Sequence, residues 1–381
     1  MKKYLFLALA AVATLTACQQ GEEPQTVAKS VEIQFAAAAV ETRAAVTAVT
    51  TEETLVNEGF AVWGFAGTTK IFNAAEVCSN TKQTTALDAL NLASSKIADA
   101  FSPVNTSDVK YWSANTTYMF SAMYPISLKE KYNYDWNGTT STQKITSFEN
   151  DGLIDLIVAE PSQVITDKNL DQEGKLTTNA AADLHFNHML SRIRFSFTNN
   201  FVDDNVTIEI SNLKIDNTPA SGNANIVYTP ATASIEKSNL VTWTHESDKK
   251  LFFYDSNENE TTTLVSVNSQ SNTNDDIVGE SVYRYIIPGI NDYTISFDLV
   301  VKADGNIIAS KSYTEVALPK NGLDNSTGST NVTEFIAGKG YIFNANINVD
   351  QSGALYPIQF TVTVEDWGDD IDGGDIDLSG K

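Results

Sequence analysis

The sequence predicts an all-β fold of antiparallel β-sandwich type with few short helices, because runs of alternating apolar and polar residues recur along it. The run 293–301 places an apolar side chain at every second position, and the runs 341–349 and 358–364 repeat the pattern. Strands of this kind bury one face and expose the other to water, as antiparallel sandwiches do. Helical periodicity is scarce, and its best candidate, Thr84–Ala100, predicts one short helix.

The first residues predict an export signal with a lipid attachment point. Two lysines and the apolar run 4–15 have the length of a signal peptide and are too short for a membrane-spanning helix. Leu15-Thr16-Ala17-Cys18 resembles a bacterial lipobox, in which the cysteine receives lipid and becomes the new N-terminus. Residues 19–24 are polar and acidic and resemble the signals that carry Bacteroidetes lipoproteins to the outer face of the outer membrane. We therefore expect a signal peptide at 1–17, lipid on Cys18 and a surface-exposed precursor.

A removable strand is predicted directly after this signal. In the run 31–40, Val31, Ile33 and Phe35 point to one face. Their burial stabilises a fold by about 5–8 kcal/mol in total, a large part of the about 5–15 kcal/mol that is usual for a domain. Loss of such a strand exposes an apolar slot and an unpaired backbone edge, each of which is a template for strand addition.

The scarcity of arginine predicts one cleavage site. Arg43 and Ala44 lie in a segment of small residues, whereas the other arginines fall in strand-like runs that should protect them: Arg192, Arg194 and Arg284. Cleavage after Arg43 by an arginine-specific protease would release the propeptide 18–43 together with its lipid. The alternative is that Arg43 is an arbitrary linker residue.

Two domains of ordinary size are expected from the length of 381 residues. The polar stretch 167–179 lacks apolar periodicity and is interpreted as a linker, which gives an N-terminal domain at 44–178 and a C-terminal domain at 179–381. In the second domain the apolar phase shifts across Ser211-Asn212, which predicts a β-bulge or a corner between sheets. The polar segments 255–260 and 269–276 predict mobile loops.

The net charge argues against nucleic acid as a partner, and the number of cysteines argues against an intramolecular disulfide. The net charge of −23 disfavours nucleic acid as a partner, because an acidic surface repels phosphate backbones. Cys78 is the only cysteine besides Cys18, so the mature protein has no pair for an intramolecular disulfide. We expect Cys78 to be a buried, inert thiol.

Several motifs, taken in order, resemble the fimbrillins, which are the subunits of Bacteroidetes (type V) pili. The motifs are Thr42-Arg43-Ala44 after the lipobox and first strand, the segment Leu184–Phe195, the pair Tyr285–Gly289 and Tyr293–Phe297, the segment Phe335–Tyr341, and a last strand ending at Glu365-Asp366-Trp367. The resemblance covers nearly the whole chain. It implies two tandem transthyretin-like β-sandwich domains and a structural role in a cell-surface fimbria that supports adhesion.

The resemblance also implies a mode of assembly. A lipidated precursor reaches the cell surface, an arginine-specific protease removes the stretch before the cut, and a C-terminal strand of another subunit enters the vacated groove. The residues at the C-terminus fit the donor role less well. Ile376 and Leu378 alternate, but Gly373-Gly374 and several aspartates interrupt the apolar face, so this subunit is expected to accept a strand more readily than to donate one.

No pattern for catalysis, a cofactor or a metal site stands out. His185 and His188 are three residues apart, which on a strand places them on opposite faces, so all three histidines, including His245, are interpreted as structural. The aspartates between 366 and 377 do not have the spacing of an EF-hand loop and are interpreted as a solvated tail. Five aromatic residues form either a sugar-stacking patch or part of a sandwich core: Tyr111, Trp112, Tyr132, Tyr134 and Trp136.

Two hypotheses follow from these features. In the first, the chain is a surface precursor that polymerises by strand exchange after cleavage between Arg43 and Ala44. In the second, it is a glycan-binding lipoprotein that stays tethered through Cys18 and never polymerises. The position of the subunit in a fibre, whether stalk, tip or anchor, stays open, and an enzymatic role is not expected.

Overall fold

The computed structural model describes residues 32–37, 55, 57–80, 100–166, 181–201, 205–228, 241–253, 263–268, 278–280, 283–289, 292–318, 334–347 and 360–366. Over these residues the fold is all-β and is organised in three sheets, as the alternating pattern predicted. The expected helix Thr84–Ala100, apart from Ala100, lies outside the described residues. So do the linker interpreted at 167–179, the loops 255–260 and 269–276, and the tail after Asp366, and all of these stay predictions.

The N-terminal half forms a sheet of nine strands in the order β10-β1-β4-β3-β2-β5-β8-β11, with β9 also paired to β5. The strands are β1 (Phe35–Ala37), β2 (Phe60–Ala66), β3 (Thr69–Ser79), β4 (Phe101–Pro103), β5 (Thr117–Tyr124), β8 (Ile157–Ala159), β9 (Ser162–Ile165), β10 (Ala182–Leu184) and β11 (Phe186–His188). Two short 3₁₀ helices, η2 (Thr106–Asp108) and η3 (Ile126–Lys131), lie between strands of this half.

The central strands β2 and β5 of this sheet are covered on both faces, which corrects for them the expectation that each strand exposes one face to water. In β2, Phe60 and Val62 belong to one apolar cluster, whereas the alternate residues Ala61, Trp63 and Phe65 belong to another. The second cluster includes side chains of the hairpin formed by β6 (Tyr132–Trp136) and β7 (Ser141–Glu149). The second face is therefore dry because this hairpin packs over it.

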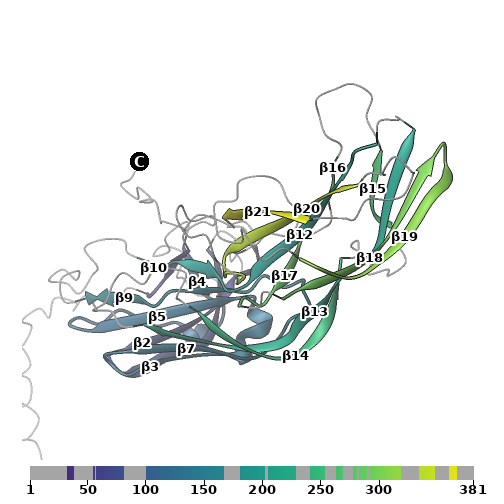
Figure 1. Ribbon diagram of the computed structural model, residues 1–381. Coiled ribbons are helices and arrows are strands. Elements are labelled where there is room, and N and C mark those ends of the chain that lie inside the picture. Colours follow the sequence, from purple (N-terminus) through teal and green to yellow (C-terminus); the bar gives the residue numbers. More distant parts are fainter. Residues whose placement is uncertain are drawn as a thin grey trace, which may run out of the picture.

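One very long strand joins the two halves. β13 (Val206–Tyr228) pairs with β7 of the N-terminal half through its last eight residues. Its first half pairs with strands of the C-terminal half, and β14 (Thr242–Phe252) follows its second half. In Figure 1, β2, β3 and β5 lie toward one end of the molecule and β18 and β19 toward the other, with β13 and β14 running between them.

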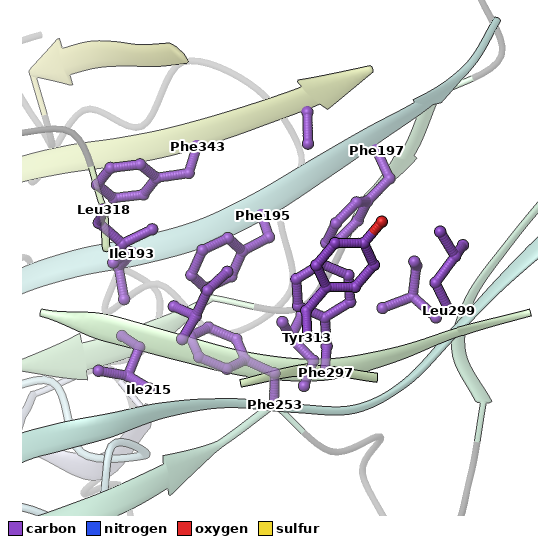
Figure 2. Close-up of a cluster of buried hydrophobic side chains, with 14 of the residues drawn as sticks. Ile193, Phe195, Phe197, Ile215, Phe253, Phe297, Leu299, Tyr313, Leu318 and Phe343 are labelled. Atoms are coloured by element: carbon purple, nitrogen blue, oxygen red, sulfur yellow. The ribbon is translucent and has the colours of Figure 1, made fainter. Parts of the chain in front are cut away.

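The C-terminal half is a sandwich of two sheets. The strands that complete it are β12 (Ser191–Asn199), β15 (Thr263–Asn268), β16 (Val278–Glu280), β17 (Arg284–Ile286), β18 (Thr294–Ala303), β19 (Asn306–Ala317), β20 (Lys339–Ile347) and β21 (Phe360–Asp366). The core contains the residues predicted to share the inner face of 293–301, and Figure 2 shows Phe297 and Leu299 of β18 packed near Phe195 and Phe197 of β12.

The predicted irregularity at Ser211-Asn212 is confirmed. The register between β13 and β18 shifts between Ser211 and Lys214, and Asn212 has a left-handed φ of 53°. The extra residue moves the apolar phase from Ile210 to Leu213, so that side chains on both sides of the bulge reach the same core.

Two strand pairs depart from the antiparallel pattern. β12 runs parallel to β20, and β1 runs parallel to β10. β10 and β11 follow the boundary expected at residue 178, yet they hydrogen-bond to β1 and β8 of the N-terminal sheet. The division at 178/179 and the transthyretin-like character of each half stay predictions.

Candidate functional site

The first described strand, β1, occupies an interior position of the N-terminal sheet. Phe35 pairs with Ala182 of β10 on one side and with Phe101 of β4 on the other. The backbone N–H of Ile33 donates to the carbonyl of Lys110 at 2.8 Å, and the carbonyl of Gln34 accepts from the N–H of Ala182 at 2.8 Å. The segment is thus hydrogen-bonded along both edges although it comes from the start of the chain.

The side chains of this segment are buried on both faces. Ile33 and Phe35 are 0% exposed, and the alternate residues Glu32 and Gln34 are only 3% and 2% exposed. The amide of Asn80, at the end of β3, donates to the side-chain oxygen of Gln34 at 3.3 Å. A segment with both faces and both edges covered is an integral part of the sheet.

Phe35 is held by aromatic rings of the neighbouring strands. Its ring centroid lies 5.5 Å from that of Phe72 and 5.4 Å from that of Phe120, both in edge-to-face geometry. Such pairs contribute about 0.5–1.5 kcal/mol beyond the burial of area. Phe35 is therefore the main anchor of the segment.

β1 also links the two ends of its sheet. β10 and β11 are separated by His185 alone, and β11 pairs with β8 at the far end of the strand order. β10 reaches the rest of the sheet through β1, which lies between β10 and β4. Removal of β1 would leave β10 and β4 with facing, unpaired backbone edges, which is a gap of one strand.

The structure covers part of the site predicted from the sequence. The strand position and burial expected for Ile33 and Phe35 are observed. Val31, the lipidation residue Cys18 and the processing residues Arg43 and Ala44 lie outside the described residues. Lipidation, cleavage and removal of the strand therefore stay predictions.

Sequence reasoning missed the polar residues of the site. Glu32 and Gln34 lie on the second face of the β1 segment, where Asn80 contacts Gln34, and Glu32 also forms an isolated antiparallel bridge with Tyr111. Alternation of polar and apolar residues normally places the polar ones in water, so the pattern carried no sign that they are buried. The neighbouring strand β4 is likewise buried at all three of its positions, but the sequence does not show which strands become neighbours.

The other arginines are located as predicted. Arg192 and Arg284 are buried within β12 and β17, and Arg194 is half-buried in β12. The guanidinium groups of Arg192 and Arg194 stack on the ring of Tyr283, at 4.5 and 4.8 Å from its centroid. A protease that reads an extended, accessible arginine has poor access to these three.

Two expectations about individual side chains are refined. Cys78 is half-buried in β3 and not fully buried, because β3 carries alternating buried and accessible residues near the end of the strand. Of the five aromatic residues considered for a sugar-stacking patch, Trp112, Tyr132, Tyr134 and Trp136 are buried in the apolar clusters and only Tyr111 is exposed, which supports the core interpretation.

The histidines have no shared ligand geometry. His188 is buried, and its Nδ1 lies 3.0 Å from Oδ1 of Asp155, whereas His245 is exposed on β14. Across the described part of the chain, His, Cys, Asp and Glu side chains form no group of three or more that could hold a metal ion. None of the helices described there has the length and apolar character needed to cross a membrane.

Solved structures that match this chain come from species of Bacteroides, Parabacteroides and Porphyromonas. A candidate cell adhesion protein from Bacteroides uniformis is 15% identical, with 89% of this chain and 99% of that chain covered and a TM-score of 0.43. A candidate cell adhesion protein from Parabacteroides distasonis is 12% identical over 89% and 97% of the two chains, with a TM-score of 0.40. The fimbrial anchor protein Mfa2 from Porphyromonas gingivalis is 10% identical over 87% and 98%, with a TM-score of 0.28.

The family assignment rests on the sequence itself. No curated protein matches the chain. Residues 42–367, however, match the model of the fimbrillin-like family. This family is structural and not a class of enzymes, and it indicates a fimbrial or adhesin-type subunit at the cell surface. The chain therefore belongs to the fimbrillin-like family.

Proposed function

We propose that the protein is a pilus subunit that is exported as a precursor lipidated at Cys18, cut after Arg43 and assembled by β-strand exchange. The observation that carries the proposal is the interior, fully buried position of Ile33 and Phe35 in the N-terminal sheet. A segment that is both integral to a sheet and joined to the fold through a potential cleavage site is suited to be replaced by a strand of another subunit.

The energetics favour replacement over simple loss. Burial of Ile33 and Phe35 stabilises the precursor by about 3–6 kcal/mol together, which is comparable to the whole net stability of many domains. After removal of the segment the fold would expose an apolar slot between two unpaired strand edges, β4 and β10. An incoming extended strand would restore both the hydrogen bonds and the buried area.

The distribution of arginine supports a single cut. The chain has four arginines, and the three outside the N-terminal segment lie in strands with their side chains buried or half-buried. Cleavage after Arg43 would remove Glu32–Ala37 together with Cys18, so one event would open the groove and detach the subunit from the membrane lipid. The family match begins at residue 42, next to this position.

The partners of this function are other pilus subunits, an arginine-specific protease at the cell surface and, before cleavage, the outer membrane through the lipid on Cys18. The mature form would reside in extracellular fimbriae and support adhesion. The tethered glycan-binding lipoprotein remains the competing hypothesis, but the burial of Trp112, Tyr132, Tyr134 and Trp136 removes most of the aromatic patch on which it relied.

The test is expression of the full chain in a Bacteroidetes host as wild type, Arg43→Ala and Arg43→Lys. We expect wild type to give a product beginning at Ala44, heat-resistant ladders on gels and fibres in electron micrographs. Both variants should accumulate as uncleaved, membrane-bound monomer, because lysine keeps the charge but not the side chain that the protease requires.

Lys29→Ala is the matched control, since it removes a basic residue from the same segment and should be cleaved like wild type. If wild type is found only as an uncleaved, lipid-bearing monomer, the pilus function is wrong and the tethered lipoprotein is favoured.

A further inference from the structure

We propose that the C-terminal half carries a binding site for a neutral sugar residue of a glycan. The site is a hollow of about 450 Å³ on the outer face of β13, β14, β18 and β19. Its polar lining includes Asn212, Lys214, Asp216, Lys250, Asp298 and Glu315. Sites for small molecules are usually about 300–1,000 Å³ in volume. The inference rests on the proposed function only for its role in adhesion, because cleavage and strand exchange concern β1 and not these strands.

The hollow forms where four neighbouring strands are irregular. The strands, which are labelled in Figure 1, pair in the order β14-β13-β18-β19, and the register shifts in each of the three pairings, close to residues 211–218 of β13 and 295–297 of β18. Asn212 and Glu315 lie at two of these shifts, on either side of β18, and have left-handed φ values of 53° and 52°. Because a bulge bends its strand and increases the local twist, bulges on neighbouring strands hollow the surface of the sheet between them.

The hollow has a packed floor. Phe297 of β18 and Tyr313 of β19 belong to the C-terminal core, as Figure 2 shows, and their rings stack with 4.9 Å between the centroids. Side chains on the opposite face of the same strands therefore project from a well-packed base. Strands position the groups of a binding site more precisely than loops do.

Hydrogen bonds orient two acidic groups of the hollow. Ser296 donates from Oγ to Oδ2 of Asp216 at 2.6 Å. Asp298 accepts at Oδ2 from the side-chain amide of Asn212 at 2.6 Å, and at Oδ1 from the hydroxyl of Ser312 at 2.5 Å. A carboxylate has about four acceptor positions, so each of the two aspartates retains positions for a ligand.

Two lysines supply the donors. Within the described residues, Lys214 and Lys250 form no salt bridge, although the chain has 48 acidic residues against 25 lysines and arginines. The ammonium of Lys214 lies 5.6 Å from the ring centroid of Phe252, which is half-buried. Each ammonium carries three N–H donors that a ligand can use, and the ring beside Lys214 adds an apolar surface.

The mixture of charges favours a neutral ligand with several hydroxyl groups. A phosphate or carboxylate would lie beside Asp216, Asp298 and Glu315, whereas a cation would lie beside the two lysines. An apolar ligand would bury these charges without partners. Each sugar hydroxyl, in contrast, both donates and accepts, so it can pair with a carboxylate and an ammonium at once. Lys250, Thr314 and Glu315 are exposed, so the hollow opens to solvent and can take one residue of a longer glycan.

The first test measures binding by the full chain carrying Arg43→Ala, so that the result does not depend on cleavage or assembly. This precursor, in a detergent without a sugar headgroup, is applied to an array of glycans that end in glucose, galactose, mannose, fucose, N-acetylglucosamine or N-acetylgalactosamine. The same array carries glycans that end in glucuronate or sialic acid. We expect binding to glycans with a neutral terminal residue and weaker binding to the acidic ones. Calorimetry with the glycan that binds best then gives the Kd.

The second test locates the site with two pairs of matched variants of the same precursor. Lys214→Met removes an ammonium from the hollow, and Lys144→Met makes the same change at an exposed position of β7. Thr314→Met narrows the hollow, and Ser310→Met adds the same side chain four residues away on the same face of β19. We expect each hollow variant to weaken binding about tenfold or more, while both controls bind like the parent. Thermal unfolding shows that each variant is folded.

The outcomes separate this inference from the pilus function. If wild type is cleaved and polymerises while the folded precursor binds no neutral glycan, the pilus function stands and the sugar site is wrong. Tighter binding to glucuronate or sialic acid than to any neutral glycan also overturns the inference, and so does equal binding by the folded hollow variants and their controls. Binding to a neutral glycan that both hollow variants weaken supports the site, even if wild type never polymerises.

Discussion

The N-terminal sheet and the C-terminal sandwich differ in where their interior strands come from. In the C-terminal half, the interior strand β12 lies in the middle of the chain and is held between β20 and the strands β16 and β17. In the N-terminal sheet, the interior strand β1 is the first described segment of the chain and precedes the proposed cleavage site. Under the proposed cleavage, the same kind of buried strand would be permanent in one half and separable in the other.

Under the proposed cleavage, burial alone would not decide which strand stays in the protein. Phe35 and Phe195 are both fully buried and both pack edge-to-face on neighbouring rings. Backbone cleavage near either residue would have different consequences, because β12 is tied to the fold on both sides in the sequence whereas β1 is tied on one side after signal removal. In the proposed assembly, strand exchange would therefore take place in the half that carries β1.

The largest effect is expected from truncating these two anchors. Phe35→Ala and Phe195→Ala should each destabilise the uncleaved precursor by about 3–5 kcal/mol, because each leaves a cavity in a core. In the cleaved, mature subunit only Phe195→Ala should still lower the stability, because Phe35 is no longer part of the protein. Denaturant unfolding measures the loss of stability in both forms. The precursor is held uncleaved by Arg43→Ala, and the mature subunit is measured beside it. Equal destabilisation of the mature subunit by the two substitutions would contradict the comparison.

A smaller effect is expected from two glycines that hold left-handed turns, one in each half. Gly59, before β2, has φ of +75°, and a Cβ there would lie 2.1 Å from the carbonyl oxygen of Val77. Gly305, between β18 and β19, has φ of +78°, and nothing lies within 4 Å of a Cβ there. Gly305→Ala should cost about 1–2 kcal/mol for the backbone alone. Gly59→Ala should cost more, because the backbone of β3 must also move.

Thermal unfolding of the two glycine variants in the Arg43→Ala background tests this order. A smaller loss of stability for Gly59→Ala than for Gly305→Ala would show that the start of β2 is loosely packed. In that case the N-terminal sheet would not be the rigid acceptor that strand exchange requires.

The smallest effect is expected from Asp298 in the C-terminal half. Hydrogen bonds from Ser312 and Asn212 lower the pKa of this carboxyl below its ordinary value of 3.8. A carboxyl whose pKa is lower in the folded state stabilises the fold at pH values above its pKa in the unfolded state. This contribution disappears as the pH falls through the pKa of the folded state. Asp298→Asn should therefore destabilise the protein at pH 7 by about 0.5–1.5 kcal/mol and much less at pH 2. Denaturant titrations at both pH values measure the difference, and an equal loss at both would contradict the assignment.

Much of the C-terminal sandwich could be predicted from the sequence. Apolar and polar residues alternate along its strands, and this pattern matches strands with one buried face and one face exposed to water. The inner face of 293–301 and the bulge at Asn212 are examples. The buried polar residues of the β1 segment could not be predicted, because the burial of Glu32 and Gln34 depends on elements far away in the sequence. Asn80 at the end of β3 is one of them.

The same limit applies to the connection between the halves. Apolar residues of β13 enter two different clusters, Ile208 and Ile210 in one and Ala224 and Ile226 in the other. A period-two pattern does not show where a strand changes partners.

The most direct measurement is mass-spectrometric peptide mapping with amide hydrogen exchange on fibres purified from wild-type cells, beside the Arg43→Ala precursor. The account predicts that the fibre subunit begins at Ala44 and contains no residues 32–37, while the backbone amides of β4 and β10 exchange as slowly as in the precursor because a new strand pairs with them. Fibres whose subunits retain residues 32–37 would contradict the account.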